Sequence, residues 1–257
     1  MRLLRVIPCL LLRGTGLVKT VRFKDPSYVG DPRNAVKIFN EKEVDELLLL
    51  DIGATAAAAE PNFGLISEVA SECFMPFGYG GGIRRLVQAE RILKLGAEKI
   101  CINTAAVEQP RLIAQAAQRL GTQSIVASID VKSGPRGEYE VLVRNGAKST
   151  GLDPVAHAQR MEEAGAGEIL LNAIDRDGTM TGYDLELVRR VSGAVRVPVV
   201  ACGGAGSVAD LAAAVTRGGA AAAAAGSLFV FHGRHRAVLI SFPERSALEA
   251  AWQGECA

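Results

Sequence analysis

The sequence predicts an α/β protein that folds as a single (β/α)8 TIM barrel with a twofold internal half-barrel repeat. Short apolar runs alternate with helix-like segments along all 257 residues, which is typical of a parallel sheet covered by helices. Glycine pairs and other landmarks recur after 122 residues, and no linker separates the two copies. This offset relates Gly81-Gly82 to Gly203-Gly204, Gly96 to Gly218, Thr104 to Gly226, and Asp31-Pro32 to Asp153-Pro154. Two copies of about four βα units each are best accommodated by one closed barrel.

The first half, about residues 1–122, contains four expected strands, each a short run dominated by apolar residues. The strands are expected at 4–10, 46–51, 73–79 and 99–102, and the helices at 31–43, at 62–71, before Gly96 and at 109–120. Asp31 followed by Pro32 predicts a helix start, because aspartate caps a helix and proline fits its first turn. Residues 11–31 are expected to form a long loop.

The second half, about residues 123–236, repeats this order. Strands are expected at 124–130 and 168–172, helices from Asp153 and at 184–191, a long loop at 132–152 and a polar loop at 174–179. The last two strands and their helices are expected within 201–229, a stretch rich in alanine and glycine. One barrel domain is expected to span residues 1–257. Its last segment, residues 237–257, is a divergent tail.

Composition and charge exclude several classes of function. The net charge is +1, with 29 basic and 28 acidic residues, so no nucleic-acid or anionic membrane surface is expected. The basic, apolar N-terminus is interrupted by Pro8 and lacks a small-residue cleavage site, so we expect a first strand and a cytoplasmic protein. Five cysteines without C-x-x-C spacing are expected to be buried and reduced, and no metal or cofactor is predicted. The histidines, His157, His232 and His235, are expected at the surface.

Two glycine-rich turns predict two phosphate sites. Glycine at a strand-to-helix turn lets backbone N–H groups approach an anion, and the next helix N-terminus adds a favourable dipole. The first site is expected at Gly81, Gly82, Asn103 and Thr104, and the second at Gly203, Gly204, Gly226 and Ser227. Such turns are also common in α/β proteins without phosphate ligands, but their recurrence in both halves favours a substrate with a phosphate at each end.

Carboxylates at strand ends are the candidate catalytic groups, because chemistry in this fold lies where strands end. Asp130 ends the fifth strand and is the candidate general acid or base. A structural alternative is that it caps a loop or pairs with Lys132. Asp177 and Gly178, in the loop after the sixth strand, are assigned to substrate binding, with turn formation as the alternative.

Four charged residues lie at the opposite ends of the strands. Arg5, Glu46, Lys99 and Glu168 each stand at or near the start of a predicted strand. In the simpler interpretation they form a salt-bridged plug that closes the barrel floor. In the alternative they form a gate on a passage along the barrel axis, and the residues alone leave both interpretations open.

The chain resembles the cyclase subunit of imidazole glycerol phosphate synthase over about residues 4–236. The segments that carry the resemblance lie at 6–10, 30–32, 45–47, 79–83, 102–106, 165–170, 175–179 and 203–206. The resemblance implies a lyase-type cyclase that receives ammonia from a glutaminase subunit docked on the barrel floor, as a heterodimer. It also implies a gate at the four charged residues and ring closure on a bisphosphate intermediate of histidine biosynthesis. Lys19 is expected to help close over this substrate.

One position departs from that family. The family places an aspartate after Ile-Pro-Cys-Leu, as partner of the one matching Asp130, where this chain has Leu11. Three functions therefore remain: a cyclase in which Asp130 and Asp177 share the proton transfers, an ammonia-channelling paralogue, or a non-catalytic activator of the glutaminase. The paralogue most resembles the surface-polysaccharide branch of the family, in which the acceptor would be a sugar amidotransferase of O-antigen (lipopolysaccharide) biosynthesis. The tail from Arg236 also departs from the family pattern.

Overall fold

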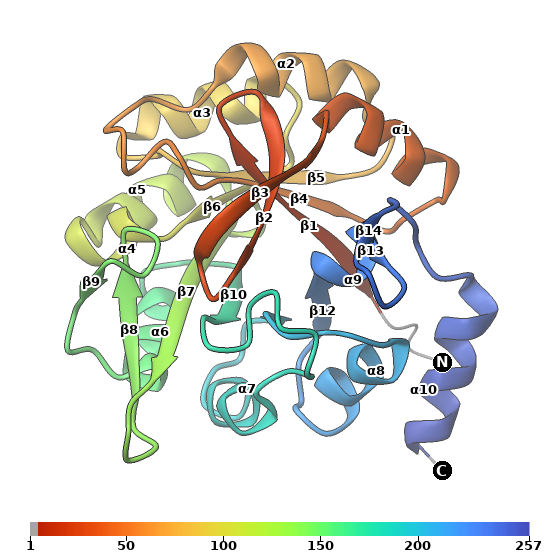
Figure 1. The fold of residues 1–257 in the computed structure, drawn as a ribbon. Coiled ribbons are helices and arrows are strands. Elements are labelled where there is room, and N and C mark those ends of the chain that lie inside the picture. The colour runs from red at the N-terminus through yellow and green to blue at the C-terminus, as the bar shows by residue number, and fades with distance from the viewer. Residues whose placement is uncertain (1–4, 257) are drawn as a thin grey trace.

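Eight parallel strands form a closed barrel, which confirms the predicted fold class (Figure 1). The computed structural model describes residues 5–256, so residue 4, expected to begin the first strand, lies outside the described part. Strand β12 pairs with β1 and closes the ring, with Val6 opposite Ala223. The barrel strands are β1 (Val6–Arg13), β4 (Leu47–Asp51), β5 (Phe77–Gly80), β6 (Lys99–Ile102), β7 (Ile125–Ser133), β10 (Glu168–Ala173), β11 (Val199–Cys202) and β12 (Ala222–Ala225).

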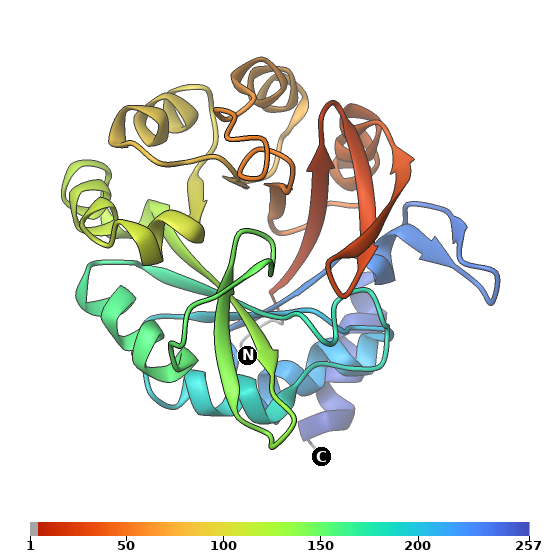
Figure 2. The same cartoon turned by 60° about the vertical axis from the view of Figure 1, so that its left-hand side comes forward.

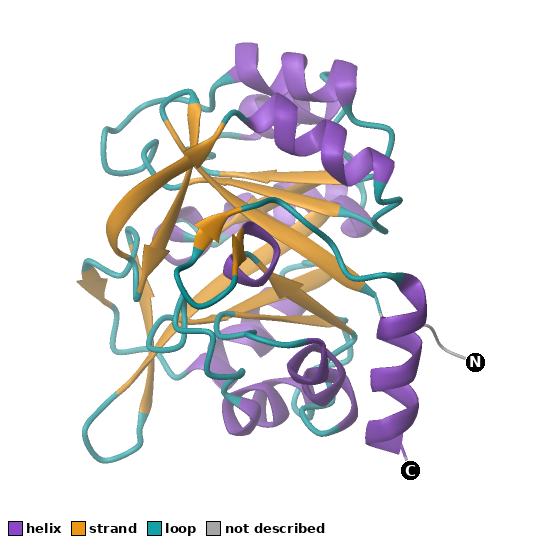
Figure 3. Cartoon of the chain, turned by 45° about the vertical axis from the view of Figure 1, so that its right-hand side comes forward, coloured by secondary structure: helices purple, strands orange, loops and turns teal. Residues whose placement is uncertain are grey.

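Helices surround the barrel (Figures 1 and 3). They are α1 (Pro32–Glu41), α2 (Phe63–Glu72), α3 (Leu86–Lys94), α4 (Thr104–Glu108), α5 (Arg111–Leu120), α6 (Pro154–Glu163), α7 (Leu185–Ser192), α8 (Val208–Thr216), α9 (Ser227–Val230) and α10 (Arg245–Cys256), with a short 3₁₀ turn at Thr122–Ser124. None of the helices in residues 5–256 is long and apolar enough to cross a membrane.

The predicted helix starts at Asp31 and Asp153 are confirmed. The Asp31 carboxylate accepts hydrogen bonds from the backbone N–H groups of Arg33 and Asn34, at 2.8 and 3.3 Å. The Asp153 carboxylate accepts one from the N–H of Ala156 at 2.9 Å. Each cap satisfies donors that the first helical turn leaves free, and the following proline has no N–H to satisfy.

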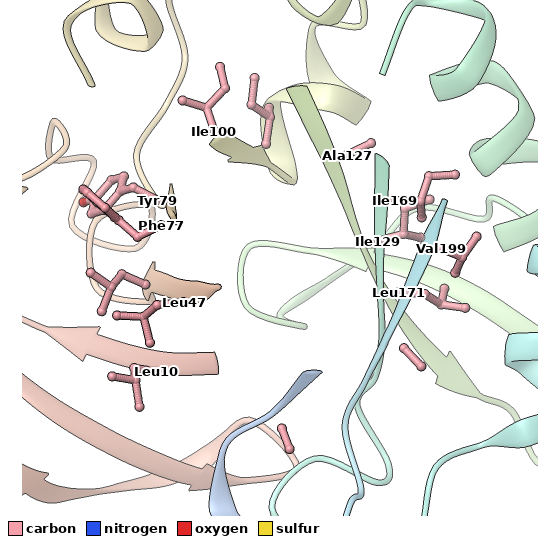
Figure 4. Packing of buried hydrophobic residues seen from close by; sticks show 14 of the residues in the cluster. Leu10, Leu47, Phe77, Tyr79, Ile100, Ala127, Ile129, Ile169, Leu171 and Val199 are labelled. Atoms are coloured by element: carbon pink, nitrogen blue, oxygen red, sulfur yellow. The ribbon is translucent and has the colours of Figure 1, made fainter. Parts of the chain in front are cut away.

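The alternation of side chains along each strand divides the apolar residues into two cores. Outward-facing residues such as Leu10, Leu47 and Ile100 pack beneath the helices and form the larger core (Figure 4). Inward-facing residues fill the interior of the barrel with a smaller apolar core: Ile7, Cys9, Leu48, Cys101, Val126, Leu170, Val200, Cys202, Ala222 and Ala224. A barrel of eight strands is just wide enough for such side chains to fill.

Two sequence expectations about polar side chains need correction. His157 was expected at the surface but is 3% exposed, because it lies on the inner side of helix α6 with Ala158 and Met161. Burial, with a smaller effect of Arg160, lowers the pKa of His157 to about 4. Cys73 follows helix α2 and is only half-buried, whereas three of the five cysteines lie inside the barrel; the Cys256 side chain lies outside the described part.

The repeat is visible in the element boundaries. Helices α3 and α8 begin and end 122 residues apart, whereas strands β6 and β12 are 123 residues apart. One residue is therefore inserted after helix α8. The equivalents of Gly96 and Thr104 are then Gly219, which shares a positive φ, and Ser227, not Gly218 and Gly226 as predicted.

The two segments expected as long loops contain strands (Figure 2). Strand β1 continues to Arg13 and pairs in antiparallel fashion with β2 (Gly16–Val21), which pairs with β3 (Lys24–Gly30). Strand β7 likewise continues into a sheet with β8 (Tyr139–Val143) and β9 (Lys148–Ser149). We call these two extensions the β2–β3 arm and the β8–β9 arm. The arms meet where the Phe23 ring lies beside Gly146.

The tail supplies the last outer helix of the barrel. The two helices expected in the stretch 201–229 are present as α8 and the four-residue α9, which begins at Ser227 and ends at Val230. After α9 the chain forms a hairpin of β13 (Phe231–His232) and β14 (Ala237–Val238), and α10 then packs against α8. Leu248 of α10 is buried, and the Phe242 ring packs on Phe229 at 5.1 Å between centroids.

Candidate active site

A cavity of about 1050 Å³ opens at the carboxyl ends of the barrel strands. It brings together every residue that the sequence assigns to catalysis or substrate binding: Lys19, Gly81, Gly82, Asn103, Thr104, Asp130, Asp177, Gly178, Gly203, Gly204, Gly226 and Ser227. These residues come from strands and loops of both halves of the chain. Residues 5–256 contain no cluster of three or more His, Cys, Asp or Glu side chains suited to a metal ion.

The first glycine turn requires glycine for two reasons. Gly81 and Gly82 have φ values of +119° and +70°, a region that residues with a Cβ rarely adopt. A Cβ on Gly81 would also collide with the backbone oxygen of Asp51. Asn103 directly precedes helix α4, and Thr104 accepts a hydrogen bond through Oγ1 from the N–H of Arg144 at 3.0 Å.

The second glycine turn is packed even more closely. Gly203 and Gly204 have φ values of +87° and +119°, and a Cβ on Gly204 would collide with the backbone oxygen of Gly182. The Lys19 ammonium lies directly over Gly226, where a Cβ would collide with it. Lys19 is 7% exposed and donates a hydrogen bond to the Cys9 carbonyl at 2.8 Å. Its positive charge is therefore fixed beside the second turn.

Asp130 lies at the floor of the cavity, buried between neighbouring strands. Burial raises the pKa of Asp130 to about 7, the negative charge of Asp177 acts in the same direction, and the Asn172 amide opposes both. The Asn103 amide donates a hydrogen bond to Asp130 Oδ2 at 3.2 Å. A carboxyl group with this pKa can both donate and accept a proton near neutral pH. Lys132, the pairing partner considered from the sequence, is exposed.

Asp177 is held by the β2–β3 arm. Its Oδ2 accepts a hydrogen bond from the Thr20 hydroxyl at 2.8 Å, and its carbonyl accepts one from the N–H of Arg22 at 2.9 Å. Burial raises the pKa of Asp177, while Lys19 and the Thr20 hydroxyl act to lower it. Gly178 packs so closely on Thr20 that a Cβ would collide with the Thr20 carbonyl. Asp175, two residues earlier, instead accepts a bond from the N–H of Ser133 and does not line the cavity.

Leu11 stands where the other half of the barrel has Asp130. Leu11 pairs with Leu50 of the adjacent strand, as Asp130 pairs with Asn172, and Leu50 and Asn172 are related by the 122-residue offset. All four residues line the cavity. One half of the cavity floor is therefore apolar, and the equivalent part of the other half is polar.

The four charged residues at the opposite ends of the strands form one ion-pair cluster. Lys99 Nζ bonds to Glu46 at 2.9 Å and to Glu168 at 2.8 Å. Arg5 pairs with Glu168 and lies 3.8 Å from Glu46. The Glu46 and Glu168 side chains are almost fully buried. None of the four lines the cavity, because the inner apolar core lies between.

Several cavity residues were missed by sequence reasoning. Asn172 follows Glu168 and Leu170 at alternate positions of one strand, so strand alternation could have placed it inward. Arg84 donates to the carbonyls of Ala58 and Ala59, and no local sequence pattern indicates those long-range contacts.

Arg236, from the hairpin of β13 and β14, braces the loop that carries Asp177. Both its terminal guanidinium nitrogens donate to the Gly178 carbonyl, at 3.2 and 3.3 Å, and its guanidinium lies over the Phe231 ring at 4.5 Å.

We expect Arg236→Ala to weaken binding of a phosphate compound by about fivefold, equivalent to about 1 kcal/mol for the lost bonds. Calorimetric titration measures this affinity. Arg234→Ala, at the exposed turn of the same hairpin, is the matched control; an equal loss in both variants would contradict the bracing role.

The fold and the position of this cavity define the class of the protein: a (β/α)8 barrel whose candidate active site lies at the carboxyl ends of its strands. The chain belongs to the histidine biosynthesis protein family, whose profile matches residues 5–236.

Relatives of nearly the same length support this membership. A Pseudomonas aeruginosa protein, provisionally named imidazole glycerol phosphate synthase subunit hisF2, is 58% identical over 245 residues, covering 95% of this chain and 98% of the relative. A provisionally named subunit HisF of Leptospira interrogans is 49% identical over 96% of this chain and 97% of its own. The imidazole glycerol phosphate synthase subunit HisF of Alkaliphilus metalliredigens is 45% identical, covering 89% of this chain and 90% of the relative. The resemblance noted in the sequence is confirmed at the level of this family.

Proposed function

We propose that this chain is a cyclase-type barrel subunit that uses ammonia released by a partner glutaminase subunit. The observation that carries the proposal is the separation of two polar sites along one barrel. The cavity with Asp130 and both glycine turns lies at one end, and the ion-pair cluster lies at the other. The family reaction is ring closure and cleavage of phosphoribulosyl-formimino aminoimidazole carboxamide ribotide. Its products are imidazole glycerol phosphate and aminoimidazole carboxamide ribotide.

The cavity supplies the chemistry that this reaction needs. The two glycine turns offer backbone N–H groups and small surfaces to the terminal phosphates, and Lys19 adds a positive charge beside the second turn. Asp130 is the proton donor and acceptor. At the other end, Arg5, Glu46, Lys99 and Glu168 act as the ammonia gate, and the inner apolar core favours passage of neutral ammonia.

A second candidate function is favoured by Leu11. The missing carboxylate removes half of the family's acid–base pair while the ion-pair cluster and both glycine turns remain. In this alternative the chain passes ammonia to a different acceptor, a sugar amidotransferase of surface-polysaccharide biosynthesis. A third alternative is a non-catalytic activator of the glutaminase.

Turnover of the bisphosphate separates these functions. The purified chain is supplied with the bisphosphate and ammonium, and then, in complex with the glutaminase, with the bisphosphate and glutamine. Formation of imidazole glycerol phosphate in both assays supports the cyclase. Glutamine hydrolysis by the complex without bisphosphate turnover contradicts the cyclase function and leaves the two alternatives.

Leu11→Asp tests whether the substrate still matches the family's. We expect about a 10²-fold gain in the ammonium-dependent rate, because one positioned proton-transfer group contributes at least that much. Leu11→Asn is the matched control, since asparagine has nearly the same size as aspartate but transfers no proton. Equal rates for the two variants would indicate that the cavity takes a different substrate.

A further inference from the structure

Asn172 presents a hydrogen-bond acceptor to the cavity that no group in residues 5–256 satisfies. Its side chain is 8% exposed, and its Oδ1 atom has no hydrogen-bond partner. Folded proteins rarely leave a buried acceptor unpaired, because nothing then replaces its lost hydration. Because Asn172 lines the cavity, a ligand there can supply the missing donor.

A second acceptor lies on the adjacent strand. Asn172 of β10 stands directly opposite Asp130 of β7 in the strand register, and both line the cavity. Neighbouring strands are about 4.8 Å apart, so a small molecule with several N–H bonds can reach both side chains. Since the amide Oδ1 and an ionised carboxylate are both acceptors, this part of the floor repels a phosphate and favours an N–H donor.

The position of Asn172 along strand β10 identifies which N–H donor this is. The inward side chains of the strand are, in order, Glu168 in the ion-pair cluster, Leu170 in the inner apolar core, and Asn172. A molecule that enters through the ion-pair cluster therefore meets Asn172 as the first polar group of this strand at the cavity. Under the proposed function this molecule is ammonia, which carries the required N–H bonds.

We propose that Asn172 Oδ1 and the Asp130 carboxylate form a binding subsite for ammonia, which donates N–H hydrogen bonds to both. The proposal rests on the proposed use of ammonia but not on the identity of the second substrate. In the subsite the nitrogen nucleophile is held at the floor of the cavity, below the two glycine turns. Two further charged groups lie near the floor: Asp177, in the loop that follows β10 and bonded to Thr20, and Lys19, on the β2–β3 arm and bonded to the Cys9 carbonyl.

The test measures the pKa of Asp130 by carbon NMR of the labelled full-length chain during a titration with ammonium chloride. Tetramethylammonium chloride, which has the same charge but no N–H bond, is the control for ionic strength. Ammonium that binds only when Asp130 is ionised lowers its apparent pKa by about 0.3 when the ammonium concentration equals the dissociation constant, and by about 1 at tenfold that concentration. No turnover is needed, so the result is independent of the bisphosphate assay.

Variants assign the effect to Asn172. Asn172→Ala and Asn172→Leu both remove the acceptor, and the second keeps the volume filled, so we expect both to abolish most of the ammonium effect. Asn34→Ala, at an exposed position of helix α1, is the matched control and should behave as the unmodified chain. The proposal is overturned if ammonium and tetramethylammonium act alike, or if the ammonium effect persists in both Asn172 variants.

Discussion

Asp130→Asn is expected to slow ammonia-dependent turnover by about 10²- to 10⁴-fold, the usual contribution of a positioned acid–base group. Asparagine keeps the shape and can still accept the hydrogen bond from Asn103, but it transfers no proton. The rate of the unmodified chain should change with pH around 7, where Asp130 titrates, and the variant should lose this dependence. Pre-steady-state and steady-state rates between pH 5.5 and 8.5 measure both effects.

The same substitution should stabilise the fold above neutral pH. The folded chain holds the Asp130 proton up to about pH 7, while an ordinary aspartate releases it near 3.8. Stability therefore falls as pH rises through this window, because the unfolded chain releases this proton while the folded chain retains it. We expect Asp130→Asn to raise the free energy of unfolding at pH 8 by about 2–4 kcal/mol. Asp175→Asn is the matched control, since Asp175 does not line the cavity; equal rate losses in both variants would contradict the role of Asp130.

Glu168→Ala is expected to lower the free energy of unfolding by about 3 kcal/mol. Glu168 bonds both Lys99 and Arg5, and its removal leaves two cations that share Glu46 in a mostly buried cluster. For a chain of this size the midpoint of thermal unfolding should fall by roughly 6–12 °C. Glu90→Ala, which breaks the exposed pair with Arg119, is the matched control and should cost less than about 1 kcal/mol.

Rate measurements on a variant of the ion-pair cluster distinguish the plug interpretation from the gate interpretation. As a gate it should transmit ammonia, so Glu168→Gln should lower the glutamine-dependent rate of the complex more than the rate with added ammonium. As a plug it should affect stability and leave the ratio of the two rates unchanged.

Burial disfavours the Lys99 ammonium, but Glu168 and Glu46 more than compensate and raise its pKa. The contribution of Lys99 to stability is therefore complete at neutral pH and is lost only as pH rises above 10.5.

The sequence predicted the fold class and the two glycine turns of the cavity, because both follow from local patterns that occur twice. Apolar runs that end in Asp51 and Asp130 indicate buried parallel strands, and glycine pairs indicate turns with positive φ. Capping by Asp31 could also be recognised, since it depends only on adjacent residues.

The strands of the two arms and helix α10 of the tail were not predicted from the sequence. The segment after Leu10 was interpreted as a loop, although Gly14 with φ +64° makes a tight turn between alternating residues of β1 and β2. Charged side chains on the exposed face of the arm obscured this alternation. Helix α10 packs on α8 through contacts distant in sequence, and the inserted residue near Gly219 shifts the repeat without a local signal.

Closure of the barrel by β1 and β12 has a consequence for synthesis of the chain. Val6 of β1 can pair with Ala223 of β12 only when nearly all of the polypeptide has left the ribosome. Until then the nascent first strand lacks one of its two barrel neighbours, and its open edge can pair with other chains. Contacts between such distant residues form late in folding. Early packing of the first half against this strand would therefore protect the growing chain from aggregation.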